Sequence, residues 1–184
     1  MLQRHKIQLT IAAGAVAVAG IAAVSVLAPS WSPRPVAASL TFDPLTRAET
    51  PADRAAQRSI SVDVGVVVTS ARTLGAVDGV NYLIAADKEK GVCLLAVVSS
   101  QDVRVACRSI ADLPSGGLWL EFGDQQGSYL AVARPSEYRD ATLETTAEVV
   151  HQDDVLVVAR TAGRGQTKLV LHSDKLADLV VRKG

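Results

Sequence analysis

Two cysteines, Cys93 and Cys107, have the spacing that most directly suggests chemistry in this 184-residue sequence. They lie at equal distances from Ser100, the centre of a hairpin predicted from strands at 92–98 and 103–107. Equal distances from a turn place two residues opposite each other on paired strands. If the domain is exported, these two cysteines are expected to form a disulfide. The alternatives are two buried free thiols or a redox-active pair, although the spacing is not Cys-x-x-Cys.

The histidines offer a second possible chemistry. His151 and His172 each follow an apolar pair and precede one polar residue and then an aspartate, Asp153 or Asp174. Imidazole and carboxylate groups are metal ligands, so one hypothesis is a metal site that uses both histidines. The interpretation we favour is that each His-x-Asp ends a strand and opens a polar turn. We therefore predict no metal site and no cofactor.

No catalytic constellation is apparent in the sequence. A Gly-x-Ser-x-Gly motif is absent, and a glycosidase would need substrate-binding aromatic residues, which make up only 4% of the chain. The acids available for such a site are Glu121, Glu144 and Glu148. We interpret Trp119, Phe122 and Tyr129 as packing residues rather than a ligand platform. No catalytic residue is predicted, and a binding or structural role is favoured over an exported hydrolase or metal-dependent enzyme.

These residues belong to a region with the two-residue period of β-strands. The clearest hairpin joins 73–77 to 80–85 through Asp78-Gly79, a pair that favours a type I′ turn. The other expected strands are at 60–68, 92–98, 103–107, 117–122, 128–133, 142–150, 155–160, 167–172 and 179–182, with a brief helix within 108–114. We predict an all-β domain over 59–184, a small antiparallel sandwich or barrel.

A proline-rich segment at 29–58 precedes this domain and is expected to be a linker. Five of the seven prolines fall between residues 29 and 51. Within the segment, Thr50 could cap a short helix that begins at Pro51 and ends near Arg58, with Asp53 in its first turn. Irregular chain throughout the linker is the alternative.

A charge-free apolar segment at residues 7–28 predicts a transmembrane helix. Ala, Val, Ile and Leu make up 17 of its 22 residues, and as a helix it would be about 33 Å long, enough for the hydrocarbon core. Arg4 and Lys6 precede it, so the positive-inside rule places residues 1–6 in the cytoplasm and the rest of the chain outside. The alternative to a retained anchor is a signal peptide cleaved after residue 28 or 38.

The charge balance limits the partners that we expect. There are 19 Lys+Arg and 19 Asp+Glu, and two of the basic residues precede the apolar segment, so the rest carries 17 against 19, or −2. A nucleic-acid-binding protein would show a basic excess, so no nucleic acid is expected. The expected partners are membrane lipid around residues 7–28 and a protein of the envelope. An accessory subunit of a membrane complex is a further alternative.

Several short motifs resemble those of uncharacterised membrane-anchored envelope proteins of actinobacteria, over about residues 40–160. The motifs are Phe42-Asp43-Pro44-Leu45 with Asp53 after it, Ser70-Ala71-Arg72-Thr73-Leu74-Gly75, Asp78-Gly79-Val80-Asn81-Tyr82, Val92-Cys93-Leu94 and Gly117-Leu118-Trp119-Leu120. The resemblance implies a membrane anchor, an extracytoplasmic location and a disulfide hairpin. It implies no catalytic activity.

Overall fold

The fold is taken from a computed structural model of the chain, which describes residues 39–124, 127–161 and 166–183. The tail at 1–6, the apolar segment at 7–28 and the first part of the linker lie outside these residues. Among the residues described, no helix is long and apolar enough to span a membrane.

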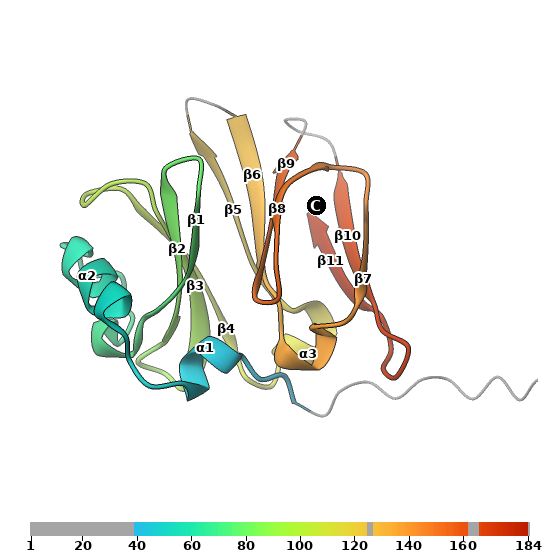
Figure 1. Cartoon of the computed structure of the whole chain (residues 1–184), viewed down its shortest axis with the longest axis horizontal. Helices are drawn as coiled ribbons and strands as arrows, with labels where there is room; N and C mark the ends of the chain where they lie inside the picture. Colours follow the sequence, from blue (N-terminus) through green and yellow to red (C-terminus); the bar gives the residue numbers. More distant parts are fainter. Residues whose placement is uncertain (1–38, 125–126, 162–165, 184) are drawn as a thin grey trace, which may run out of the picture. The chain divides into compact units, whose positions relative to one another are not determined.

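The described residues form eleven strands in three antiparallel sheets (Figure 1). The first sheet has the order β1-β2-β3-β4, formed by Arg72–Val77, Val80–Ala86, Gly91–Val97 and Val103–Ser109. The middle sheet has the order β5-β6-β9-β8, formed by Leu118–Asp124, Gly127–Ala133, Leu156–Thr161 and Glu148–Gln152. The third sheet has the order β11-β10-β7, formed by Leu179–Lys183, Thr167–His172 and Thr142–Thr145.

The three sheets lie as layers, with the middle sheet between the other two (Figure 1). Residues 129–133 of β6 and 156–159 of β9 are all buried. On one side of this sheet, the ring of Phe122 lies 6.1 Å from that of Tyr82 in the first sheet. Leu169, Leu171, Leu179 and Val181 of the third sheet belong to the same hydrophobic core. The all-β prediction is therefore confirmed, with three sheets where one sandwich or barrel was expected.

The two predicted hairpins of the first sheet are confirmed. In the β1–β2 turn, Asp78 and Gly79 both have positive φ, 51° and 81°, as a type I′ turn requires. In the β3–β4 hairpin, Cys93 lies directly opposite Cys107. The register predicted from equal distances to Ser100 is therefore the observed one.

The strand predicted at 60–68 is not formed. Gly65 has a φ of 76°, the Asp63 carboxylate accepts a hydrogen bond from its N–H, and only Val66 makes a β-bridge, to Asp87. A 3₁₀ helix, η1 (Val68–Ser70), follows. The alternating apolar side chains of this segment, apart from the exposed Val62, instead pack on the outer face of the first sheet, where they and residues of that sheet form a second hydrophobic core.

Two other predicted elements have different bounds. The strand expected at 142–150 is two strands, β7 and β8, which belong to different sheets. The chain turns between them at 146–147, where Thr145 Oγ1 accepts a hydrogen bond from the N–H of Ala147. The helix expected within 108–114 is α3 (Leu113–Gly116), and a second 3₁₀ helix, η2 (Ser136–Tyr138), follows β6.

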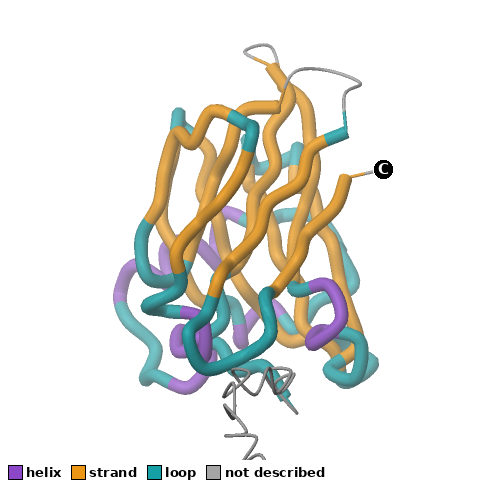
Figure 2. Tube along the Cα trace, turned by 90° about the vertical axis from the view of Figure 1, so that its right-hand side faces the viewer, coloured by secondary structure: helices purple, strands orange, loops and turns teal. Residues whose placement is uncertain are grey.

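The segment at 40–58, expected to be linker, is folded against the sheets. It contains α1 (Asp43–Thr46) and α2 (Pro51–Ser59), and Thr50 is the N-cap of α2, as predicted. The physical reason is burial, because Leu40 and Phe42 are 6% and 4% exposed and lie in the main core. Figure 2 shows the helices gathered toward one end of the strands. The described part of the folded domain therefore begins before residue 59.

Candidate functional site

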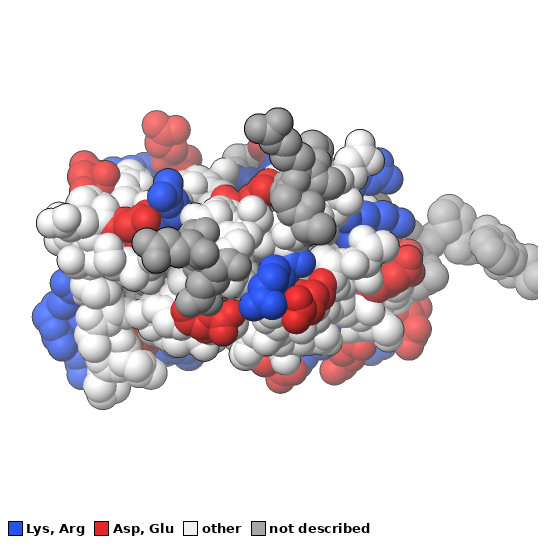
Figure 3. Space-filling model, turned by 90° about the horizontal axis from the view of Figure 1, so that it is seen from above, with Lys and Arg blue, Asp and Glu red and all other residues white. Residues whose placement is uncertain are grey.

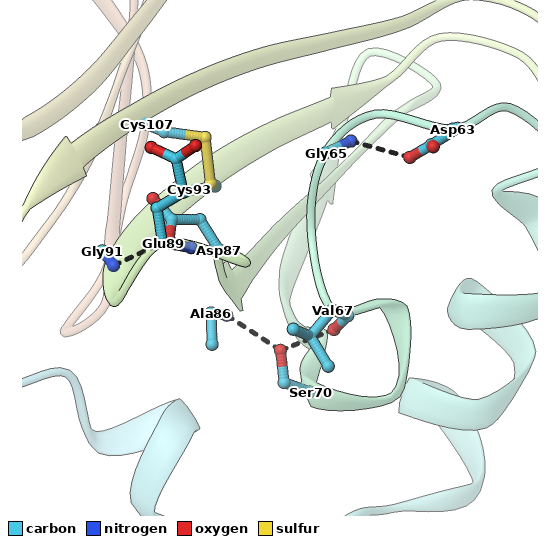
Figure 4. Close-up of a disulfide and its surroundings, with 10 residues drawn as sticks. All are labelled: Asp63, Gly65, Val67, Ser70, Ala86, Asp87, Glu89, Gly91, Cys93 and Cys107. Atoms are coloured by element: carbon cyan, nitrogen blue, oxygen red, sulfur yellow. Dashed lines mark hydrogen bonds between the residues drawn. A yellow bond between two sulfur atoms is a disulfide. The ribbon is translucent and has the colours of Figure 1, made fainter.

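The two cysteines lie at disulfide distance, as predicted (Figure 4). Their sulfur atoms are 2.06 Å apart and their Cα atoms 4.0 Å apart. Cys93 is fully buried in the second core, whereas Cys107 on the edge strand β4 is exposed. The pair therefore closes the β3–β4 hairpin beneath the segment that covers the first sheet.

A tight turn at Asp87 lies beside the disulfide (Figure 4). Its carboxylate Oδ1 accepts hydrogen bonds from the N–H groups of Glu89 and Gly91, at 2.5 and 2.8 Å. A Cβ at Gly91 would lie 2.4 Å from Asp87 Oδ2 and 2.6 Å from the Arg108 carbonyl oxygen, so only glycine fits. Of the residues described, only Asp87, Cys93 and Cys107 bring three ligand-type atoms within 4.8 Å of one another. With the sulfurs joined, this cluster is a structural crosslink.

His151 and His172 are not brought into one site. His151 lies on β8 of the middle sheet and its Nε2 is 3.0 Å from Asp153 Oδ2. Asp153 Oδ1 also accepts hydrogen bonds from two backbone N–H groups, those of Val155 and Leu156. The favoured interpretation, that this His-x-Asp opens a polar turn, agrees with the geometry.

The sequence pattern suggested Asp174 as the acidic partner of His172, but the structure gives His172 two other acids. It lies on β10 of the third sheet, with Nε2 2.8 Å from Glu144 and Nδ1 3.0 Å from Asp178. These hydrogen bonds raise the pKa of His172 above its ordinary value, and the bond to Glu144 has the largest effect. Two of the acids considered for a glycosidase are engaged elsewhere, because Glu144 pairs with His172 and Glu148 pairs with Arg160 at 3.0 Å.

Asp53 forms a buried polar site that joins α2 to β1. Its Oδ2 accepts hydrogen bonds from Arg47 Nη1 at 2.5 Å and from the Thr50 N–H and hydroxyl at 2.7 and 2.8 Å. Its Oδ1 accepts from Arg47 Nη2 at 2.9 Å and from the Thr73 N–H at 2.7 Å. The Arg47 guanidinium is the main reason that the pKa of Asp53 is held far below its usual range. The sequence predicted the cap but not the ion pair or the bond to β1.

A groove with an indole in its wall lies where β4, the start of β5 and β11 meet. Its volume is about 350 Å³, and its lining residues are Arg108, Ser115, Gly116, Trp119, Val180 and Arg182. The Arg108 guanidinium carbon lies 5.6 Å from the centroid of the Trp119 ring, a cation–π contact. Trp119 is half-buried, so part of its surface faces the groove rather than the core. From its sequence, Trp119 was expected to be a packing residue.

Other surface charges are mixed in sign. Figure 3 shows Lys and Arg side chains lying among Asp and Glu side chains on the face it presents, rather than in one basic patch.

Comparisons with known proteins add no assignment to these sites. No family model, no curated protein and no solved structure matches the chain.

Proposed function

We propose that the chain is a single-pass membrane protein whose β domain lies on the extracytoplasmic side and acts as a binding or structural module of the envelope. The observation that carries the proposal is the Cys93–Cys107 pair at 2.06 Å. Disulfides persist in oxidising compartments and are rare in the cytosol. An apolar segment at 7–28, with Arg4 and Lys6 before it, is the feature that would export the domain.

A binding role has more support than an enzymatic one. The enzymatic alternatives considered from the sequence relied on His151 and His172 meeting, or on facing carboxylates with aromatic residues nearby. Each histidine instead pairs with its own acids on a different sheet. The groove beside Trp119 offers guanidinium groups and an indole, which are groups that can hold an anionic and partly apolar ligand.

Location can be tested by labelling cysteines in intact cells that express the full chain. A membrane-impermeant maleimide should label the protein only after a reductant has opened the disulfide, and the exposed Cys107 should react first. A chain with Cys93→Ala and Cys107→Ala is the matched control for background labelling. Labelling without reductant, or labelling only after lysis, would contradict the proposal.

The anchor is tested separately by the intact mass of the protein purified from membranes. The full 184-residue mass is expected. Loss of the first 28 or 38 residues would show that the apolar segment is a cleaved signal peptide and not an anchor. The proposal that the domain is exported would be unaffected.

A further inference from the structure

The groove beside Trp119 is positively charged because two arginines face it without acidic partners. None of its six lining residues is acidic. Arg108 contacts the Trp119 ring, and Arg182 is exposed; neither guanidinium has an ion pair with the residues described. By contrast, Arg104 on the same strand as Arg108 is paired with Asp102 at 2.8 Å. Two guanidinium groups at one groove are suited to a phosphate or another oxyanion.

The same groove offers apolar surface next to those charges. Trp119 and Val180 are both half-buried and line it together. An indole presents a flat apolar surface, on which the C–H face of a sugar ring packs well. Ser115 and Gly116 also line the groove, and Gly116 has no side chain to obstruct entry.

We propose that this groove binds a phosphorylated sugar. The phosphate would lie between Arg108 and Arg182, and the sugar ring would lie against Trp119 and Val180. A volume of about 350 Å³ is at the small end of ligand sites and suits a single sugar with its phosphate. The inference rests on the binding role proposed above and gives it a ligand class.

A phosphate next to a sugar ring occurs in two kinds of molecule. A free sugar phosphate is a monoester, whereas a sugar linked through phosphate in an envelope polymer is a diester. Both place an oxyanion next to a sugar ring, so the test includes one probe of each kind.

Intrinsic fluorescence gives a local readout. The chain has two tryptophans, Trp31 and Trp119, so a full-length Trp31→Phe protein reports on Trp119 alone. Purified in a detergent without a sugar headgroup, it should show saturable fluorescence changes with glucose 1-phosphate or with its methyl phosphodiester. Tighter binding of the diester would identify the polymer as the source, and tighter binding of the monoester would identify the free metabolite.

Variants separate the two parts of the site. Calorimetry should show at least about ten-fold weaker binding for Arg108→Gln and for Arg182→Gln, since each removes a hydrogen bond to a charged group. The matched control Arg104→Gln, on the same strand but outside the groove, should bind as the parent does. Trp119→Leu should weaken the binding of the sugar phosphate and leave the binding of inorganic phosphate unchanged. Circular dichroism checks that each variant folds.

Three results would overturn the proposal. These are no saturable binding of either probe, equal affinity for inorganic phosphate and glucose 1-phosphate, or unchanged affinity in the Arg108→Gln, Arg182→Gln double variant. Because the assay uses purified protein, such a failure is distinct from a failed labelling experiment in cells.

Discussion

Replacing the buried carboxylate of Asp53 by an amide should weaken the attachment of α2 to the first sheet. Asp53→Asn keeps the size of the side chain and one oxygen. That oxygen can still accept from Arg47 Nη2 and the Thr73 N–H, which lie 2.9 and 2.7 Å from Oδ1 in the parent. The amide nitrogen then occupies the place of Oδ2, where three donors from Arg47 and Thr50 converge. The substitution therefore places the N–H groups of the amide next to these three donors, with no acceptor between them, in a fully buried position.

The expected loss of unfolding free energy is about 3 kcal/mol. Breaking a buried ion pair by changing one partner costs about 3–5 kcal/mol. The Arg47 side chain is 36% exposed and can reach water when its partner is neutral, so the lower end of this range applies. With a urea dependence of about 2 kcal/mol per M, the unfolding midpoint should fall by about 1.5 M.

The acid dependence of stability gives a second test of the same interaction. The pKa of Asp53 is depressed in the folded state, so its contribution is fully present above the unfolded pKa of about 4. It is lost as the pH falls below that value toward the folded pKa. Asp53→Asn should therefore lose less stability than the parent between about pH 5 and pH 3, the upper part of the range over which such a carboxylate loses its contribution.

Urea unfolding followed by far-ultraviolet circular dichroism at several pH values measures both effects. The matched control is Asp63→Asn, because Asp63 also accepts a backbone hydrogen bond and pairs with a cation but is 80% exposed. Its unfolding midpoint should not change measurably. A loss below about 1 kcal/mol for Asp53→Asn, together with an unaltered acid dependence, would refute the reasoning, because a buried pair should cost several times that.

Three further predictions concern the disulfide, its adjoining turn and the third sheet. Cys93→Ala with Cys107→Ala should lower the unfolding free energy by about 3 kcal/mol, the chain-entropy value for a 15-residue loop, and remove any effect of reductant on the urea midpoint. Gly91→Ala should lower the thermal midpoint by several degrees, because its Cβ would lie 2.6 Å from a backbone oxygen. The pKa of His172, followed by NMR, should lie above 6.5 and fall in Glu144→Gln; the stabilisation from its charge is present below the unfolded pKa and is lost as the pH rises through the folded pKa.

Each of these predictions has a control within the chain. Gly116→Ala should be tolerated, because no atom lies within 4 Å of its Cβ position, and an equal loss there would contradict the steric argument. Glu148→Gln removes an acid paired with Arg160 and should leave the His172 titration unchanged. For the disulfide, reduced parent protein that unfolds at the same urea concentration as oxidised protein would refute the crosslink's contribution.

The fold class and the disulfide register followed from local features of the sequence. Asp78-Gly79 determines its own turn, and symmetry about Ser100 places Cys93 opposite Cys107 without reference to any distant residue. The helix start at Thr50 was predictable for the same reason, because a cap is set by neighbours within one turn.

The features that the sequence did not predict depend on distant partners. An extended segment that covers a sheet face also alternates its apolar side chains, so residues 60–68 had the period of a strand without pairing as one. The groove is a second case, since it joins Arg108, Trp119 and Arg182 from three strands with no shared periodicity. Nothing in the neighbourhood of Trp119 along the chain distinguishes a groove wall from a core residue.

The disulfide and the groove meet on the edge strand β4. Cys107 and Arg108 are consecutive, so their side chains project to opposite faces: one is bonded to β3, and the other contacts Trp119. An edge strand has a ladder partner on one side only, and β4 is held there by β3. The covalent link at Cys107 therefore fixes the backbone position from which Arg108 reaches the groove. The proposed extracytoplasmic location would favour oxidation of the two cysteines. Through β4, the resulting disulfide would also hold the groove in its preformed shape.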